Sequence, residues 1–184
     1  MTSAATTAST GPQLFIGLMS GTSLDGVDGV LADFSGTHPR ILAHDAQPFS
    51  PALKEELLAL NTASDNELHR AALAANGLVH VYAQTVRALL ARTQTEARDV
   101  RAIGAHGQTV RHQPGAFDGT GYTLQLNNPA LLAELTGIDV VADFRSRDVA
   151  AGGQGAPLVP VFHQGIFGQT HRTVGVLNIG GIAN

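Results

Sequence analysis

Cysteine is absent from the 184-residue sequence, and lysine occurs only once, at Lys54. The first absence excludes disulfides, thiol nucleophiles and thiolate zinc sites, and it is typical of proteins kept in a reducing compartment. A P-loop nucleotide site needs a lysine beside its glycine-rich turn. Lys54 instead lies within residues 51–58, which have an ordinary helical pattern, so the sequence excludes a P-loop enzyme.

Positive charge and long apolar runs are also scarce. Lysine and arginine total 11 against 15 aspartates and glutamates, which gives a formal net charge of 11 − 15 = −4. Without a basic cluster, a nucleic-acid partner is not expected. No apolar run approaches the roughly 18 residues of a membrane-spanning helix, and residues 1–12 lack the features of a secretory signal. We therefore expect a disordered tail over residues 1–12, a cytoplasmic location and no membrane partner.

The spacing of apolar residues predicts three strands followed by alternating helices and strands. The first three strands are expected over residues 14–19, 27–34 and 40–46. Ser50 and Pro51 predict a helix start, and a capping box over 64–67 precedes a long amphipathic helix that ends near Arg92. Further strands are expected over 100–105, 122–126, 138–142 and 173–179, with helices starting at Pro129 and over 160–167.

This order of elements indicates an α/β fold. Strands that alternate with helices are usually parallel, so the later strands should extend the antiparallel opening into a mixed sheet. A natural domain seldom finishes on an exposed apolar strand. We therefore expect residues 13–172 to form one lobe, and 173–184 to begin the second lobe of a truncated protein.

Residues 19–28 form the first motif that carries chemistry, and they lie in the predicted hairpin turn. Gly21 and Gly26 permit a tight turn, and Thr22 and Ser23 supply hydroxyl groups. Such a turn can cradle phosphate without lysine, and an adjacent carboxylate such as Asp25 can hold Mg²⁺. An ordinary polar hairpin turn is the alternative.

The second motif follows the predicted strand 100–105. His106, Gln108 and Thr109 bring an imidazole, an amide and a hydroxyl together, a combination that suits sugar hydroxyls. Ligands bind at the carboxyl ends of strands in open α/β sheets, which favours this interpretation. A structural loop histidine is the alternative. The spacing of six residues between His106 and His112 matches no usual zinc pattern.

The third motif, over residues 143–157, contains two carboxylates, two guanidinium groups and three glycines. It suits a loop that binds a polyol with an anionic group. The alternatives are an Arg/Asp network that holds a long loop, and a glycosidase pair of Asp143 and Asp148. A fourth motif over 177–184, a strand running into two glycines, is compatible with a second phosphate-contacting turn.

The four motifs occur in one order, and together they closely resemble the anhydro-N-acetylmuramic acid kinases of bacterial cell-wall recycling. The resemblance covers residues 14 to 184 and corresponds to the N-terminal half of a family member. It implies an α/β, ribonuclease H-like lobe of the actin, hexokinase and heat-shock ATPase superfamily, with a mixed sheet and flanking helices. It also implies a reaction in which 1,6-anhydro-N-acetylmuramic acid, ATP and water give N-acetylmuramic acid 6-phosphate and ADP.

The same resemblance implies roles for individual residues. It assigns ATP to the turn, with Mg²⁺ at Asp25, and the anhydro-amino sugar to the second and third motifs. The nucleotide-binding residues are Gly21, Thr22, Ser23, Leu24, Asp25, Gly26, Val27 and Asp28. The sugar-binding residues are His106, Gln108, Thr109, Asp143 and Arg145, with Arg147 as the alternative partner of the sugar's carboxylate. The resemblance implies that the general base is the Asp of an Asp-Thr-Gly-Pro motif beyond Asn184, so we expect no catalytic base within this chain and no turnover by it alone.

This chain departs from the family pattern in three respects. Family members are roughly twice as long, Ser146 stands where an Arg is common, and Asn127 stands where a Gly is common. A different sugar kinase of the same superfamily and a non-catalytic sugar-binding fragment are the alternatives. A homodimer is a further expectation that the sequence leaves open.

Overall fold

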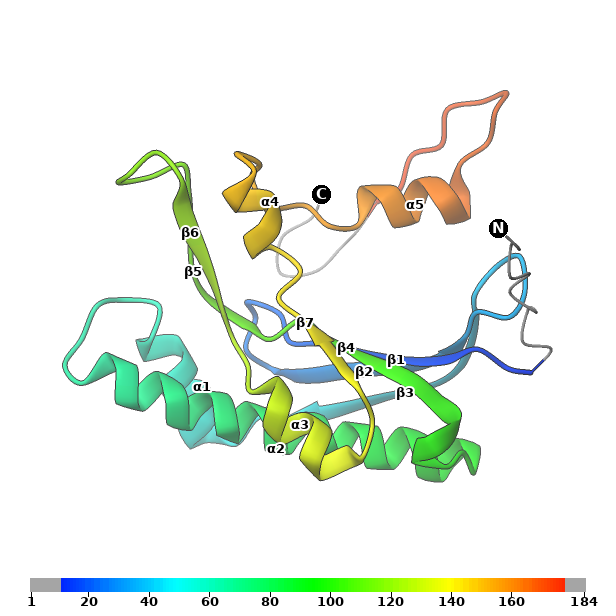
Figure 1. Cartoon of the computed structure of the whole chain (residues 1–184), viewed down its shortest axis with the longest axis horizontal. Helices are drawn as coiled ribbons and strands as arrows, with labels where there is room; N and C mark the ends of the chain where they lie inside the picture. The colour runs from blue at the N-terminus through cyan, green and yellow to red at the C-terminus, as the bar shows by residue number, and fades with distance from the viewer. Residues whose placement is uncertain (1–10, 178–184) are drawn as a thin grey trace, which may run out of the picture.

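A computed structural model describes residues 11–177 (Figure 1). The strands are β1 (Leu14–Met19), β2 (Gly26–Asp33), β3 (Arg40–Pro48), β4 (Val100–Ala105), β5 (Gln108–Pro114), β6 (Gly121–Leu126) and β7 (Val140–Ala142). The α-helices are α1 (Pro51–Ala59), α2 (Glu67–Thr93), α3 (Pro129–Thr136), α4 (Ser146–Ala150) and α5 (Pro160–Phe167), and a 3₁₀ turn, η1, covers Ala97–Asp99.

The central sheet has five strands in the order β3-β2-β1-β4-β7. β1 pairs antiparallel with β2, which pairs antiparallel with β3, whereas β1, β4 and β7 are mutually parallel. The predicted α/β fold with a mixed sheet and flanking helices is therefore confirmed. Because β1, β4 and β7 run in one direction, the three segments that follow them leave the sheet at the same edge.

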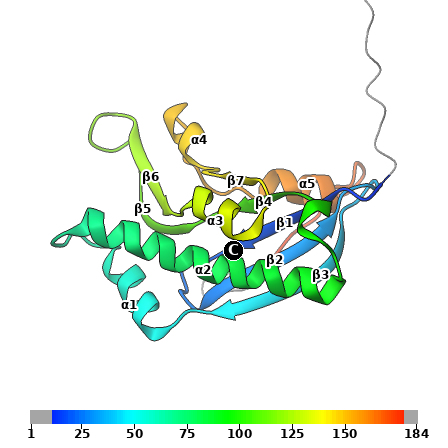
Figure 2. The ribbon, with the colours of Figure 1, turned by 60° about the horizontal axis from the view of Figure 1, so that its bottom comes forward.

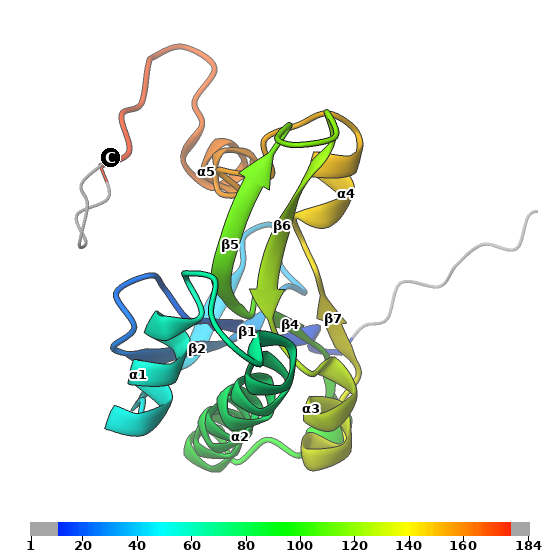
Figure 3. The ribbon, with the colours of Figure 1, turned by 90° about the vertical axis from the view of Figure 1, so that its left-hand side faces the viewer.

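Helices α1, α2 and α3 cover one face of the sheet, as the end-on view in Figure 3 shows. Tyr82, Val86 and Leu89 of α2 are fully buried against the strands, because they recur on one side of the helix at spacings of four and three. A Cβ atom at Gly29 of β2 would lie 2.4 Å from the Thr85 side chain. Glycine therefore allows the long helix to lie directly on β2 (Figure 2).

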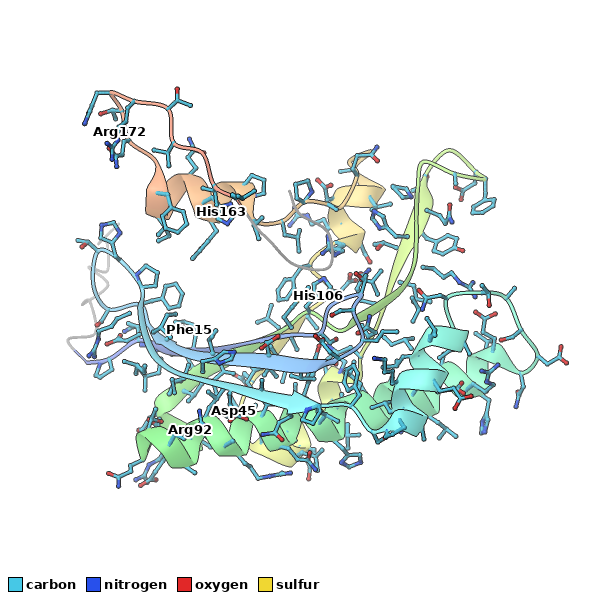
Figure 4. All side chains as sticks on the ribbon, turned by 180° about the vertical axis from the view of Figure 1, so that it is seen from behind. Phe15, Asp45, Arg92, His106, His163 and Arg172 are labelled. Carbon is cyan, nitrogen blue, oxygen red and sulfur yellow. The ribbon has the colours of Figure 1, made fainter. Side chains whose placement is uncertain are left out.

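The opposite face of the sheet is apolar and carries only a partial cover among the described residues. It borders a cavity of about 510 Å³ between the sheet and α5, lined by side chains that include Phe15, Val30, Ile41, Val141 and Phe162. Phe15 lies on this face in Figure 4, while Asp45 and Arg92 mark the helix-covered side. There Arg92 Nη1 donates to the His44 carbonyl at 2.6 Å, which ties the end of α2 to β3.

Most predicted elements are present with nearly the expected bounds. Ser50 caps α1 by accepting a hydrogen bond from the Leu53 amide at 3.2 Å, and Asn128 caps α3 in the same way. Gly137 ends α3 in the left-handed conformation, as a residue without a Cβ atom can do at low cost.

Four details differ from the prediction. The capping box is wrong: α2 begins at Glu67 after a left-handed Asn66 without a side-chain cap, and Ser64 Oγ accepts from Arg70 instead, at 2.8 Å. Strand β5 lies in what the sequence indicated as a loop, because its pairing partner β6 lies across a six-residue connection. Helix α4 lies inside the predicted loop 143–157. Residues 173–177 form no strand, and 178–184 lie outside the described residues.

Candidate functional site

The ends of β1 and β4 are joined directly at the edge of the sheet. The His106 amide donates to the Leu18 carbonyl at 3.1 Å, and Ser20 Oγ donates to the Gly107 carbonyl at 3.2 Å. The predicted phosphate turn and the predicted sugar loop therefore adjoin, although more than eighty residues separate them in sequence. Asp143 follows β7 at the same edge, so three of the four sequence motifs meet there.

The turn between β1 and β2 exposes polar groups and buries apolar ones. The Leu24 amide donates to the Gly21 carbonyl at 3.2 Å, and Leu24 takes a left-handed conformation with φ of 53°. Thr22 and Ser23 are exposed, whereas the side chains of Leu24 and Val27 are buried in the core. Of the eight predicted nucleotide-binding residues, Leu24 and Val27 can thus offer only their backbone to a ligand.

Asp25 is the exposed carboxylate of this turn. Its Oδ1 accepts a hydrogen bond from Ser23 Oγ at 2.9 Å, and this bond is the main reason that the pKa of Asp25 lies below its ordinary value. Asp25 and Asp28 line a shallow pocket of about 260 Å³ between the turn and β3. At the base of this pocket, a Cβ atom on Gly26 would lie 2.2 Å from the Gln47 carbonyl oxygen, so only glycine fits there.

A buried ring of hydrogen bonds fixes the two loops to α2. Tyr82 is fully buried, and its hydroxyl accepts from the Gly107 amide at 3.0 Å. Ser20 Oγ lies 3.3 Å from the same hydroxyl and donates its own proton to the Gly107 carbonyl. Tyr82 must therefore donate to Ser20, which closes the ring with every donor used once. Burial is the main reason that the pKa of Tyr82 rises to about 12.

His106 is buried beside this ring, and both of its imidazole nitrogens have hydrogen-bond partners. Figure 4 labels its position. Nδ1 lies 2.7 Å from the Gly107 carbonyl, and Nε2 accepts from Arg145 Nε at 3.0 Å. Burial, followed by the charge of Arg145, lowers the pKa of His106, while its bond to the Gly107 carbonyl opposes that shift. The ring is therefore a neutral histidine at neutral pH.

Arg145 is a half-buried cation without a carboxylate partner in the part of the chain that the structure describes. Its Nη1 donates to the Gly155 carbonyl at 2.5 Å. Within residues 11–177, Arg145 forms no ion pair with an acidic side chain. The neighbouring carboxylates bind backbone instead: Asp143 Oδ1 accepts from the Ser146 amide at 3.2 Å, and Asp148 Oδ2 accepts from the Gly155 amide at 2.7 Å. Arg147 is exposed, so the two candidate arginines have different surroundings.

A pocket of about 230 Å³ lies beside these groups. His106 and Asp143 line it together with Thr123, Gln125 and Asn127. Thr109 contacts this wall, since Gln125 Nε2 donates to its hydroxyl at 3.2 Å. The residues from β6 were not predicted, and the signal that could have found them is the pairing of the hairpin, which places Gln125 opposite Thr109.

Gln108 does not line this pocket. Its side chain is 1% exposed, and Oε1 has no hydrogen-bond partner among the described residues. The structure thus places His106 and Asp143 in the pocket wall and Gln108 in the interior. Arg145 and Thr109 do not line the pocket themselves and contact its wall through His106 and Gln125. A sugar-binding role for each of the five residues stays a prediction.

The turn fits a nucleotide-bound Mg²⁺ in its chemistry. Within residues 11–177, no three His, Asp or Glu side chains gather as a protein-only metal site. Mg²⁺ that accompanies a nucleotide needs fewer protein ligands, because phosphates and water supply the rest. Asp25 is ionised and exposed, and only one of its oxygens is engaged, by Ser23.

Among the described residues, no helix has both the length and the apolar character that a membrane span requires.

Comparison with known proteins gives one consistent family. A family model described as anhydro-N-acetylmuramic acid kinase matches residues 13–184. Proteins named anhydro-N-acetylmuramic acid kinase from Albidiferax ferrireducens, Variovorax paradoxus and Cupriavidus metallidurans are 73%, 67% and 63% identical to this chain. The matches cover 93%, 94% and 94% of this chain but 44%, 46% and 45% of the relatives. The chain therefore spans less than half the length of these relatives.

Proposed function

Since this chain belongs to the anhydro-N-acetylmuramic acid kinase family, we propose that it is part of an ATP-dependent kinase of cell-wall recycling. That kinase hydrolytically opens 1,6-anhydro-N-acetylmuramic acid and phosphorylates it to N-acetylmuramic acid 6-phosphate. One observation carries the proposal. The polar turn between β1 and β2 and the polar pocket lined by His106 and Asp143 lie at the same edge of the sheet, and the hydrogen bond from Ser20 to Gly107 joins their two segments.

The turn over residues 21–28 is the proposed nucleotide side. The hydroxyls of Thr22 and Ser23 and the free backbone amides of the turn donate to phosphate oxygens, which makes a lysine unnecessary. Asp25, ionised and exposed, holds Mg²⁺. When bound, Mg²⁺ neutralises part of the phosphate charge. The adjacent Asp28 lies 3.1 Å from His44 Nε2 and has its own partner, so Asp25 is the better ligand of the two.

The pocket beside β6 and β7 is the proposed sugar side. Its hydroxyl, amide and carboxylate groups suit the hydroxyls and the acetamido group of an amino sugar. Arg145 provides the fixed positive charge for the carboxylate of the lactyl ether, which distinguishes a muramic from a glucosamine sugar. Arginine suits this task because its planar fork can donate two parallel hydrogen bonds to a carboxylate.

The contribution of this chain to the reaction is binding and orientation. Phosphoryl transfer and ring opening depend on how closely the sugar, water and phosphate are positioned. The fixed edge of the sheet holds the turn and the pocket in one relative position through Ser20, Gly107 and Tyr82. We assign no catalytic base to residues 1–184, and we place it in the additional length that the relatives have. We therefore expect no turnover by this chain alone.

Calorimetry with the 184-residue chain tests the proposal. The chain should bind 1,6-anhydro-N-acetylmuramic acid, and a coupled assay of ADP release should remain at background. A charge-assisted hydrogen bond contributes about 1.5–3 kcal/mol, so Arg145→Ala should weaken sugar binding about ten- to a hundredfold. Arg147→Ala is the matched control, since Arg147 is exposed and only two positions away.

Three results would contradict parts of this proposal. Equal losses in the two arginine variants would show that Arg145 does not bind the carboxylate. Equal affinity of the chain for the muramic and glucosamine anhydro-sugars would show that the pocket does not select the lactyl group. Sugar-dependent ADP release by the purified chain would contradict the placement of the base outside it. Cytoplasmic location and a homodimer remain predictions of the same kind.

A further inference from the structure

We infer that His106 is a positioning residue, whose neutral imidazole in the Nδ1–H form holds the Arg145 guanidinium ready for an anionic ligand. This role differs from direct contact with a substrate, because both ring nitrogens already have protein partners. The nature of the anion, a sugar carboxylate, rests on the proposed function. The hydrogen-bond arrangement stands without it.

The partners of His106 determine its tautomer. A carbonyl oxygen can only accept a hydrogen bond, so Nδ1, 2.7 Å from the Gly107 carbonyl, carries the proton. Arg145 Nε can only donate, so Nε2, 3.0 Å away, carries a lone pair. No other assignment of protons satisfies both contacts. A doubly protonated ring would turn the Nε2 contact into a repulsion between two donors.

The same contacts leave the outer edge of Arg145 available. A guanidinium has five N–H donors. One is used by His106 and one by the Gly155 carbonyl, so 5 − 2 = 3 remain, on Nη1 and Nη2. These three have no acceptor within residues 11–177, and the cation is half-buried. Two fixed bonds therefore orient the group while its terminal edge can take a carboxylate in a bidentate manner.

Gly107 connects this pair to the phosphate turn. Its carbonyl accepts from both His106 Nδ1 and Ser20 Oγ, and its amide donates to Tyr82. Gly107 has φ of 79°, and a Cβ atom there would lie 2.6 Å from the Leu126 carbonyl oxygen. The backbone of Gly107, whose carbonyl binds His106 Nδ1, is consequently held by hydrogen bonds at both its carbonyl and its amide. Arg145 is thereby connected to Ser20 by an unbroken series of hydrogen bonds.

Two substitutions separate the two contacts of the imidazole. In His106→Gln, the side-chain amide can reach the position of Nε2, so it can still accept from Arg145 Nε. In His106→Asn, the shorter amide reaches only the position of Nδ1, so it retains the bond to Gly107 and loses Arg145. Both variants carry a neutral side-chain amide, and they differ in which partner of the imidazole is kept.

Nuclear magnetic resonance of the 184-residue chain, with ¹⁵N-labelled histidine and arginine, tests the arrangement without a ligand. At neutral pH, the His106 ring should show a protonated Nδ1 and a bare, hydrogen-bonded Nε2. The Arg145 Nε–H signal should be protected from exchange with water, should remain so in His106→Gln, and should lose protection in His106→Asn. An Nε2–H tautomer, a charged ring, or equal Arg145 signals in the two variants would overturn the inference.

Calorimetry with 1,6-anhydro-N-acetylmuramic acid then tests the consequence for binding. Substitution of a residue that orients a ligand-binding group typically costs about tenfold or more. We expect that loss for His106→Asn and a much smaller one for His106→Gln, at matched thermal stability. Equal losses in both variants would contradict the positioning role. An unmodified chain that binds no anhydro-sugar, but has the stated tautomer and Arg145 signal, would refute the proposed ligand and leave the hydrogen-bond arrangement intact.

Discussion

Tyr82→Phe should destabilise the chain strongly, although it removes a single oxygen atom. The Tyr82 hydroxyl is fully buried, and it both accepts from the Gly107 amide and donates to Ser20 Oγ. An intramolecular hydrogen bond contributes about 0.5–1.5 kcal/mol, and a buried donor left without an acceptor costs about 1–3 kcal/mol. Since the Gly107 amide would have no acceptor, we expect the free energy of unfolding to fall by about 2–3 kcal/mol.

Urea unfolding followed by circular dichroism measures this loss, and Tyr122→Phe is the matched control. Tyr122 is 41% exposed and stacks on Phe117 with ring centroids 6.0 Å apart, so its hydroxyl should contribute little. Ser20→Ala completes a double-mutant cycle. The double variant should be more stable than the sum of the two single losses predicts, because both substitutions break the same ring. A loss no larger than that of Tyr122→Phe, or strict additivity, would refute the ring of hydrogen bonds.

The same substitution should also change the dependence of stability on pH. The pKa of Tyr82 is raised from 10.0 to about 12 in the folded chain. The unfolded chain therefore loses this proton first, and the stabilisation is complete below pH 10 and lost as the pH rises toward 12. A pKa rise of this size corresponds to on the order of 3 kcal/mol. The stability difference between the unmodified chain and Tyr82→Phe should shrink over this interval, and a constant difference would contradict the assignment.

Further outcomes follow from other contacts at the same edge. Gly107→Ala should destabilise the chain far more than Gly115→Ala in urea unfolding, because both have positive φ but only Gly107 lacks room for a Cβ atom; equal losses would contradict this. The pKa of His106 is lowered from 6.5, so the stability gained over His106→Gln should be present above pH 6.5 and decline as the pH falls below it; thermal unfolding across that interval checks the sign. In the proposed kinase, Asp25→Asn should raise the Mg²⁺ requirement for ATP use and leave sugar affinity nearly unchanged, whereas an unaltered requirement would exclude Asp25 as the ligand.

Local pattern was sufficient to locate most helices and strands, because the repeat of apolar residues encodes which side of each element is buried. The stripe from Leu78 to Leu89 predicts α2, and the buried alternation of β1 and β2 predicts their hairpin. It failed where a group outside the local pattern is the hydrogen-bond or pairing partner. Ser64 has the sequence of a helix cap, yet Arg70 takes its hydroxyl. Strand β5 exists because β6 pairs with it, which no local repeat records.

The position of the second motif directly after a predicted strand was likewise sufficient to predict a ligand-facing loop, since ligands bind at the carboxyl ends of strands in open α/β sheets. That the segments after β1, β4 and β7 share one edge was established by the parallel pairing of the three strands. The state of each side chain there depended on contacts between segments far apart in the sequence. The family resemblance favoured Arg145 over Arg147, but the physical difference between them came from the structure, in which Arg145 bonds to His106, 39 residues away, and Arg147 is exposed. Hydrogen bonds depend on distance and direction within a few tenths of an ångström. The proton position on His106 and the open edge of Arg145 therefore follow from how three strand ends pack together.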